Sequence, residues 1–169
     1  MTMAQAAYQR ALELAKRESY SVQEVLTLLT DADKAGSPEA SYALGTWYLF
    51  GKNVRKNHVK AVEFLKRAAR FDIPNAAFDL AVCYEKGSGV EKNQTTAFAY
   101  YLKAAKLGDH DASYEVGRCY YHGIGTKQDR GMARIFLLAW RTSKSDKDYG
   151  KSWKGSSARR KSAPTKVLA

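Results

Sequence analysis

The sequence predicts an all-α solenoid made of four helical hairpins of 36 residues each. Two observations lead to this prediction. Similar residues recur in strict register when the chain is shifted by 36 positions, and the apolar ones are spaced like one face of an α-helix. Stacked repeats of this kind bury their apolar faces against their neighbours. Seven columns are clear: Ala40, Ala76 and Ala112; Leu44, Leu80 and Val116; Tyr48, Tyr84 and Tyr120; Gly51, Gly87 and Gly123; Asn57, Asn93 and Asp129; Ala61, Ala97 and Ala133; and Phe64, Tyr100 and Phe136.

Each column has a physical reason, which the second hairpin illustrates. Its first helix carries an apolar stripe at i, i+4 and i+8 that begins at Ala40. Gly51 ends this helix, because glycine adopts the left-handed conformation without a Cβ clash. Asn57 is a predicted N-cap of the second helix. In that helix, Ala61 permits close helix approach and Phe64 fills the core.

The first hairpin, residues 4–39, is a degenerate copy. Ser21 falls in the N-cap column, and with Glu24 it forms a predicted capping box. Pro38 suits the first turn of the following helix. Ala15 stands where the turn glycine would be, and such departures are typical of terminal repeats.

The motif Ala-x-x-x-Leu-Gly-x-x-Tyr, then Gly-x-Gly, then Asn/Asp-x-x-x-Ala-x-x-Phe/Tyr resembles the Sel-like repeat family, a relative of tetratricopeptide repeats. The resemblance covers about residues 4–141 and is clearest in 40–75 and 76–111. It implies a right-handed α/α superhelix whose first helices line a concave groove. Family members serve as adaptors and scaffolds, often in bacteria. The domains expected are therefore a solenoid over 1–141 and a C-terminal tail over 142–169.

The resemblance also implies where a protein partner would bind. In the related tetratricopeptide architecture, contacts come from first-helix residues on the concave side. Three of the matching residues form a column of their own, which favours a place in the repeat core over a contact role. Those that vary between repeats are either contacts or ordinary solvated surface. The positions are Tyr42, Thr46, Leu49 and Phe50 in the second repeat, Phe78, Val82, Glu85 and Lys86 in the third, and Tyr114, Arg118, Tyr121 and His122 in the fourth; the column is Tyr42, Phe78 and Tyr114.

The end of the last repeat is a second candidate surface. Residues 135–140 are apolar throughout, and such a segment is normally buried. No complete helical pair follows to cover it. Either Trp153, Val167 and Leu168 fold back as a cap, or another chain covers the segment, which includes weak self-association.

The tail has a different composition. The chain carries a net charge of +11. Residues 142–169 hold eight Lys/Arg and two Asp, so they contribute +6 of that charge. Their Ser, Lys and Gly content favours disorder. Arg159, Arg160 and Lys161 form a basic cluster that could contact nucleic acid or an acidic partner. A nucleic-acid-associated accessory protein is thus the alternative function, although a basic tail can also be a solubilising appendage.

No signature of catalysis or metal binding is present in the sequence, so neither an enzyme nor a cofactor is expected. The histidines His58, His110 and His122 are scattered. Cys83 and Cys119 occupy the same position in successive first helices, and stacked helices lie about 8–10 Å apart, too far for a disulfide. The chain lacks an 18-residue apolar run and a secretory signal, which predicts a cytoplasmic protein without a membrane partner.

Overall fold

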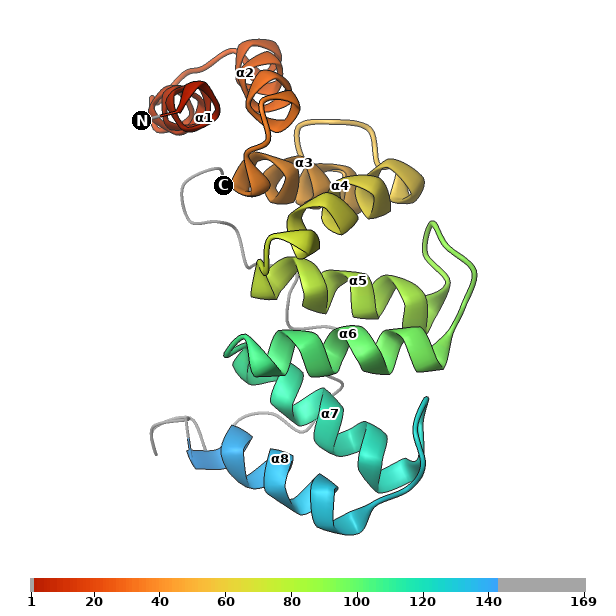
Figure 1. Cartoon of the computed structure of the whole chain (residues 1–169). Helices are drawn as coiled ribbons and strands as arrows, with labels where there is room; N and C mark the ends of the chain where they lie inside the picture. Colours follow the sequence, from red (N-terminus) through yellow and green to blue (C-terminus); the bar gives the residue numbers. More distant parts are fainter. Residues whose placement is uncertain (1, 143–169) are drawn as a thin grey trace. The chain divides into compact units, whose positions relative to one another are not determined.

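The computed structural model describes residues 2–142, which form eight α-helices of 13 residues packed as sequential hairpins (Figure 1). The predicted all-α hairpin fold is confirmed. The chain divides into two compact units, which meet between Ile73 and Pro74. The first unit contains α1 (Met3–Ala15), α2 (Val22–Lys34), α3 (Pro38–Phe50) and α4 (His58–Arg70). The second contains α5 (Pro74–Lys86), α6 (Gln94–Lys106), α7 (His110–His122) and α8 (Arg130–Thr142).

Helix ends lie where the repeat columns place them. Gly51 and Gly123 adopt the left-handed conformation with φ of 72° and 70°, and they end α3 and α7. The side chains of Asn57 and Asn93 accept hydrogen bonds from backbone N–H groups in the first turns of α4 and α6. Asp129 Oδ1 accepts one from Met132 N–H at the start of α8. The predicted caps are thereby confirmed in the last three hairpins.

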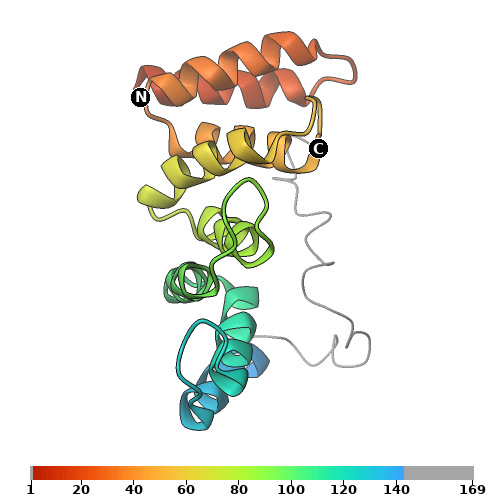
Figure 2. The ribbon, with the colours of Figure 1, turned by 90° about the vertical axis from the view of Figure 1, so that its right-hand side faces the viewer.

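The degenerate first hairpin keeps its shape by other means. Ser21 Oγ accepts from Glu24 N–H at 3.3 Å and caps α2, as predicted. The capping box with bonds in both directions lies one helix earlier, between Thr2 and Gln5. Helix α1 ends without a glycine, at Lys16 in right-handed conformation. Figure 2 shows α1 and α2 side by side as a hairpin.

Two aromatic columns of the repeat stack on one another inside each of the last three hairpins. The ring centroids are 5.7 Å apart for Tyr48 and Phe64, 5.7 Å for Tyr84 and Tyr100, and 6.0 Å for Tyr120 and Phe136. The alanine and leucine columns beside them are almost fully buried. Each unit therefore has its own core, in which the repeated residues hold a first helix against its second helix.

Hydrogen bonds between charged or polar side chains join one hairpin to the next. In the first unit, the buried Asp33 of α2 accepts from Ser41 of α3 and forms an ion pair with Arg67 of α4. In the second unit, a larger network joins α5, α6 and α7. This network contains two of the residues that the sequence proposed as partner contacts.

Candidate functional site

The network of the second unit is centred on Arg118 of α7. Its Nη2 donates to Glu85 Oε1 of α5 at 2.6 Å, and its Nε donates to Glu115 Oε2, one turn earlier, at 2.7 Å. The hydroxyl of Tyr101 on α6 donates to the other oxygen of Glu85 at 2.7 Å. Glu115 is 3% exposed, so its charge needs this compensation inside the protein. Arg118 and Glu85 thus link neighbouring hairpins to one another.

Burial and charge act in opposite directions on these groups. Burial alone lowers the pKa of the Arg118 guanidinium, but the hydrogen bonds and charges of Glu115 and Glu85 outweigh it, and the pKa is raised. Burial, followed by the charge and hydrogen bond of Glu85, raises the pKa of the Tyr101 hydroxyl. Arg118 therefore stays charged and Tyr101 stays a neutral donor, which keeps the network closed.

Exposed side chains lie at the C-terminal ends of the same two first helices. Lys86 ends α5, while Tyr121 and His122 end α7. The Tyr121 ring is 47% exposed, contacts the imidazole of His122 edge to face at 4.8 Å, and has the Arg130 guanidinium 5.9 Å from its centroid. Gln128 Nε2 donates to the backbone oxygen of Tyr121 at 2.7 Å. We call Lys86, Tyr121 and His122 the first-helix patch.

The predicted contact residues of the first unit are placed differently. Tyr42 is 7% exposed and belongs to the core. The hydroxyl of Thr46 donates to Ala43 O at 2.8 Å, and both Thr46 and Leu49 are half-buried. Phe50, at the last position of α3, is 48% exposed. Of this set, Phe50 is the residue with a large apolar surface available to a partner.

The predicted column of Tyr42, Phe78 and Tyr114 is mostly core. Phe78 is 3% exposed and meets the Tyr101 ring edge to face at 5.4 Å, so the proposal of a contact role for Tyr42 and Phe78 is corrected by their burial. Tyr114 is half-buried against Trp140 of α8, with centroids 5.0 Å apart. Val82 is half-buried against the same core.

Sequence reasoning missed the role of Tyr101. Its column reads Leu65, Tyr101 and Leu137, so a hydroxyl enters an otherwise apolar position. Glu115 is equally irregular, because the residues one and two periods earlier are Asp79 and Ala43. A polar side chain in an otherwise apolar column was the sequence feature that could have indicated a buried hydrogen-bond network. Its partners could not be named from spacing, since they come from three helices.

Residues 135–140, the apolar run that the sequence expects to be covered, lie in the second half of α8. In α8, Ala133 is buried and Phe136 packs towards the core, whereas Ile135 and Leu138 are 59% and 46% exposed. The apolar run is shorter than two helical turns, and Arg134 and Arg141 flank it on the same helix. The proposed cover by Trp153, Val167 and Leu168 lies outside the described residues, as do Arg159, Arg160 and Lys161.

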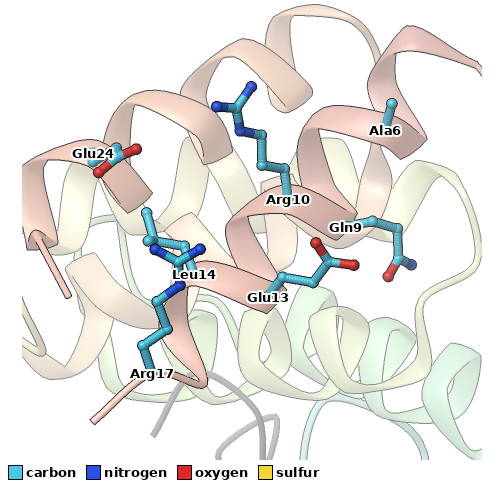
Figure 3. A pocket seen from close by; sticks show the side chains of 7 residues that line it. All are labelled: Ala6, Gln9, Arg10, Glu13, Leu14, Arg17 and Glu24. Atoms are coloured by element: carbon cyan, nitrogen blue, oxygen red, sulfur yellow. The ribbon is translucent and has the colours of Figure 1, made fainter. Parts of the chain in front are cut away.

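A pocket of about 430 Å³ lies on the first hairpin, and none of the predicted contact residues lines it (Figure 3). Its lining alternates in charge, with Arg10 and Arg17 beside Glu13 and Glu24. Such mixed charge selects no one class of ligand. Within residues 2–142 there is no cluster of three potential metal ligands.

Both cysteines are buried and free. Burial is the main cause that raises the pKa of Cys83 to about 12 and that of Cys119 to about 11. Among the helices of residues 2–142, none combines the length and the hydropathy that crossing a membrane requires.

Tandem antiparallel helix pairs with a common register define this chain as a helical-hairpin repeat protein. The Sel1 repeat family matches residues 38–70, 74–109 and 110–140, more than half of the chain, and each match corresponds to one hairpin. The chain therefore belongs to the Sel1 repeat family, and the resemblance drawn from its sequence is confirmed.

Solved structures share the fold. A Sel1 repeat protein from Oxalobacter formigenes is 27% identical with a TM-score of 0.77, and the match covers 85% of this chain and 43% of that one. The protective antigen c5321 of uropathogenic Escherichia coli is 24% identical with a TM-score of 0.76, over 86% of this chain and 34% of that one. An immunity protein, Pa5087 from Pseudomonas aeruginosa, is 21% identical with a TM-score of 0.57, over 84% and 54%.

The chain thus spans less than half the length of the first two structures. The comparison with curated proteins found no match. Sel1 repeat proteins generally mediate protein interactions, and that is the level at which family membership describes this chain.

Proposed function

We propose that this chain is a non-enzymatic adaptor that binds a segment of a partner protein on the face formed by its first helices. The observation that carries the proposal is the first-helix patch, where Lys86, Tyr121 and His122 are exposed at the ends of α5 and α7. Aromatic side chains that combine apolar area with a polar group are enriched among residues that dominate binding energy. In a right-handed superhelix of the kind the resemblance implies, this face would line the concave groove.

Side-chain contacts hold together the helices and the turn that carry the patch. The ion pair of Glu85 with Arg118 fixes α5 against α7, and Gln128 holds the backbone beside Tyr121. A surface that is ordered before binding loses less conformational entropy when a partner arrives. Glu85 and Arg118 are therefore proposed as positioning residues, and Tyr121 with His122 as the contacts.

The proposal includes a cytoplasmic location. Its support is that Cys83 and Cys119 are both free thiols, which is the usual state in a reducing compartment. The positive charge of Lys86 and the exposed ring of Tyr121 on the patch favour a partner peptide with acidic and apolar side chains.

The test compares partner capture by three full-length proteins: the wild type, the variant Tyr121→Ala/His122→Ala, and the control Val59→Ala/Glu63→Ala, which truncates two exposed residues of α4. The wild type and the control should capture the same proteins from a lysate of the source organism. We expect the amount captured by the patch variant to be at least about tenfold lower, as for a hot spot. Thermal unfolding must be unchanged in all three.

Equal capture by the patch variant and the wild type would refute the adaptor proposal. The nucleic-acid alternative predicts a different result. In that case nuclease treatment releases the captured material, and replacement of Arg159, Arg160 and Lys161 by glutamate abolishes capture.

A further inference from the structure

The outer side of α8 departs from the pattern by which second helices meet the next hairpin. One column of these helices reads Leu26, Val62, Phe98 and then Arg134. Phe98 of α6 meets Tyr120 of α7 edge to face at 5.1 Å, and Leu26 of α2 packs against the core of the first unit. In α8 the equivalent Arg134 is exposed. Because a guanidinium is costly to bury without a partner, another hairpin of the same kind would pack poorly on α8.

A second position changes in the same way. Ala105 of α6 packs against the second-unit core, and Arg141 is its equivalent in α8. Leu138, in contrast, keeps the apolar character of Leu102, and Ile135 replaces the smaller Ala99. Arg134, Leu138 and Arg141 lie at i, i+4 and i+7 on one stripe, with Ile135 beside it. We call these four residues the outer α8 face.

The outer α8 face is basic and apolar together. Helix α8 contains three arginines and no acidic residue. The exposed fractions of Ile135 and Leu138 are 59% and 46%, so the face also offers two large apolar side chains to solvent. A helix that only caps a repeat stack carries a polar outer surface, and it has no need of these two side chains.

We propose that the outer α8 face binds an acidic amphipathic helical segment of another protein. The apolar stripe of such a helix would cover Ile135 and Leu138, and its carboxylates would pair with Arg134. This surface is separate from the first-helix patch, so the inference goes beyond the function proposed above and does not depend on it.

The positive charge of the outer α8 face distinguishes among the segments that could cover it: residues 142–169, a second copy of the chain, or an acidic helix. Residues 142–169 carry eight Lys/Arg against two Asp, and they would place positive charge on a positive face. The same repulsion acts between the outer α8 faces of two copies, since each contributes its own arginines. An acidic helix is the occupant that suits both the positive charge of this face and its apolar side chains.

The test uses the full chain and a fluorescent helical peptide of about four turns, with leucines at i, i+3 and i+7 and glutamates elsewhere on the flanks. Two probes serve as controls, one with lysines in place of the glutamates and one with the same residues in scrambled order. We expect the glutamate peptide to bind at least about tenfold more tightly than either control in fluorescence anisotropy.

Variants then locate the binding. Arg134→Glu should weaken binding of the glutamate peptide at least about tenfold, and Ile135→Ser/Leu138→Ser should weaken it by a similar factor. The control Arg70→Glu changes an exposed arginine at the end of α4 and makes the same change in net charge. It should weaken binding less than about twofold.

Other outcomes overturn the proposal. Equal losses from Arg134→Glu and Arg70→Glu would show attraction by the overall charge alone. Loss of binding when Arg159, Arg160 and Lys161 become glutamate, with no effect of Arg134→Glu, would place the peptide on the tail. A dimer in sedimentation velocity that Ile135→Ser/Leu138→Ser dissociates would make this face a contact between copies.

Discussion

The hairpins α5–α6 and α7–α8 follow one another in the repeat register, yet their second helices differ in burial. Helix α6 buries Ala97, Tyr101 and Ala104, whereas in α8 Ala133 is the one residue of this helix that is buried. Helix α6 has α7 beside it and α8 ends the described stack. Equal register therefore does not produce equal burial, because each second helix is completed by the hairpin that follows it.

The two hairpins also differ in how they are fastened. The turn after α7 approaches the first residues of α6 through Gly125, and Arg118 of α7 reaches back to Glu85 of α5. The fourth hairpin is held to the third by these contacts as well as by apolar packing. Breaking each contact in turn measures how much the fourth hairpin depends on the third.

The largest loss of stability is expected from Gly125→Asn. Gly125 has φ of 69°, and Asn53, two repeats earlier in the register, has φ of 59°, so asparagine is tolerated there conformationally. A Cβ at Gly125, however, would lie 2.1 Å from the backbone oxygen of Gln94. Backbone cannot move aside cheaply, and we expect a loss of at least about 3 kcal/mol in urea unfolding.

The control for this prediction is Asn53→Gly, which removes a Cβ in the equivalent turn of the first unit. It should change the free energy of unfolding by no more than about 0.5 kcal/mol, because asparagine already suits the left-handed conformation. If Gly125→Asn is as mild as the control, the turn does not fasten the fourth hairpin.

A smaller loss is expected from Arg118→Met. The substitution keeps much of the side-chain volume but removes the ion pair to Glu115, whose side chain is 4% exposed. We expect about 2 to 3 kcal/mol, at the lower end for a buried pair because the Arg118 side chain is itself 26% exposed. Arg134→Met, an exposed arginine of the same hairpin, should cost less than about 0.5 kcal/mol. Equal effects of the two variants on the urea midpoint would contradict the structural role of Arg118.

A smaller effect is expected for the reactivity of the two cysteine thiols, one in each of the last two hairpins. Burial raises the pKa of Cys83 further than that of Cys119, so at pH 8 a larger fraction of Cys119, in the fourth hairpin, is thiolate. We expect Cys119 to react faster with a disulfide reagent, measured in the variants Cys119→Ala and Cys83→Ala. Unfolding in urea should abolish the difference.

The raised pKa values of Cys83 and Cys119 also determine whether the stability of the fold rises or falls with pH. Burial favours the neutral thiol in the folded chain, so its contribution to stability is complete below the ordinary pKa of 9.0 and is lost as the pH rises towards 11 and 12. The melting temperature of the wild type should fall above pH 9, and less steeply in Cys83→Ala/Cys119→Ala. Parallel curves would show that the thiols do not contribute.

The sequence by itself determined the 36-residue period, the positions of helix ends and the residues that hold each hairpin together. These features are local: a cap, a turn glycine or an apolar stripe acts within one repeat, and the register makes the same residue recur. What covers residues 135–140 could not be read from the sequence, because burial is not local. Whether Ile135 and Leu138 meet protein or water depends on the neighbour of α8.

Only the tertiary structure decided the roles of the proposed contact residues. It places Tyr42 and Phe78 in the core, joins Glu85 and Arg118 to Tyr101, and leaves Tyr121 and His122 exposed. Sequence spacing assigns a residue to a face of its own helix. Which charged group from another helix reaches that face is fixed by how the hairpins pack, and a difference of one helical turn separates a buried ion pair from an exposed side chain.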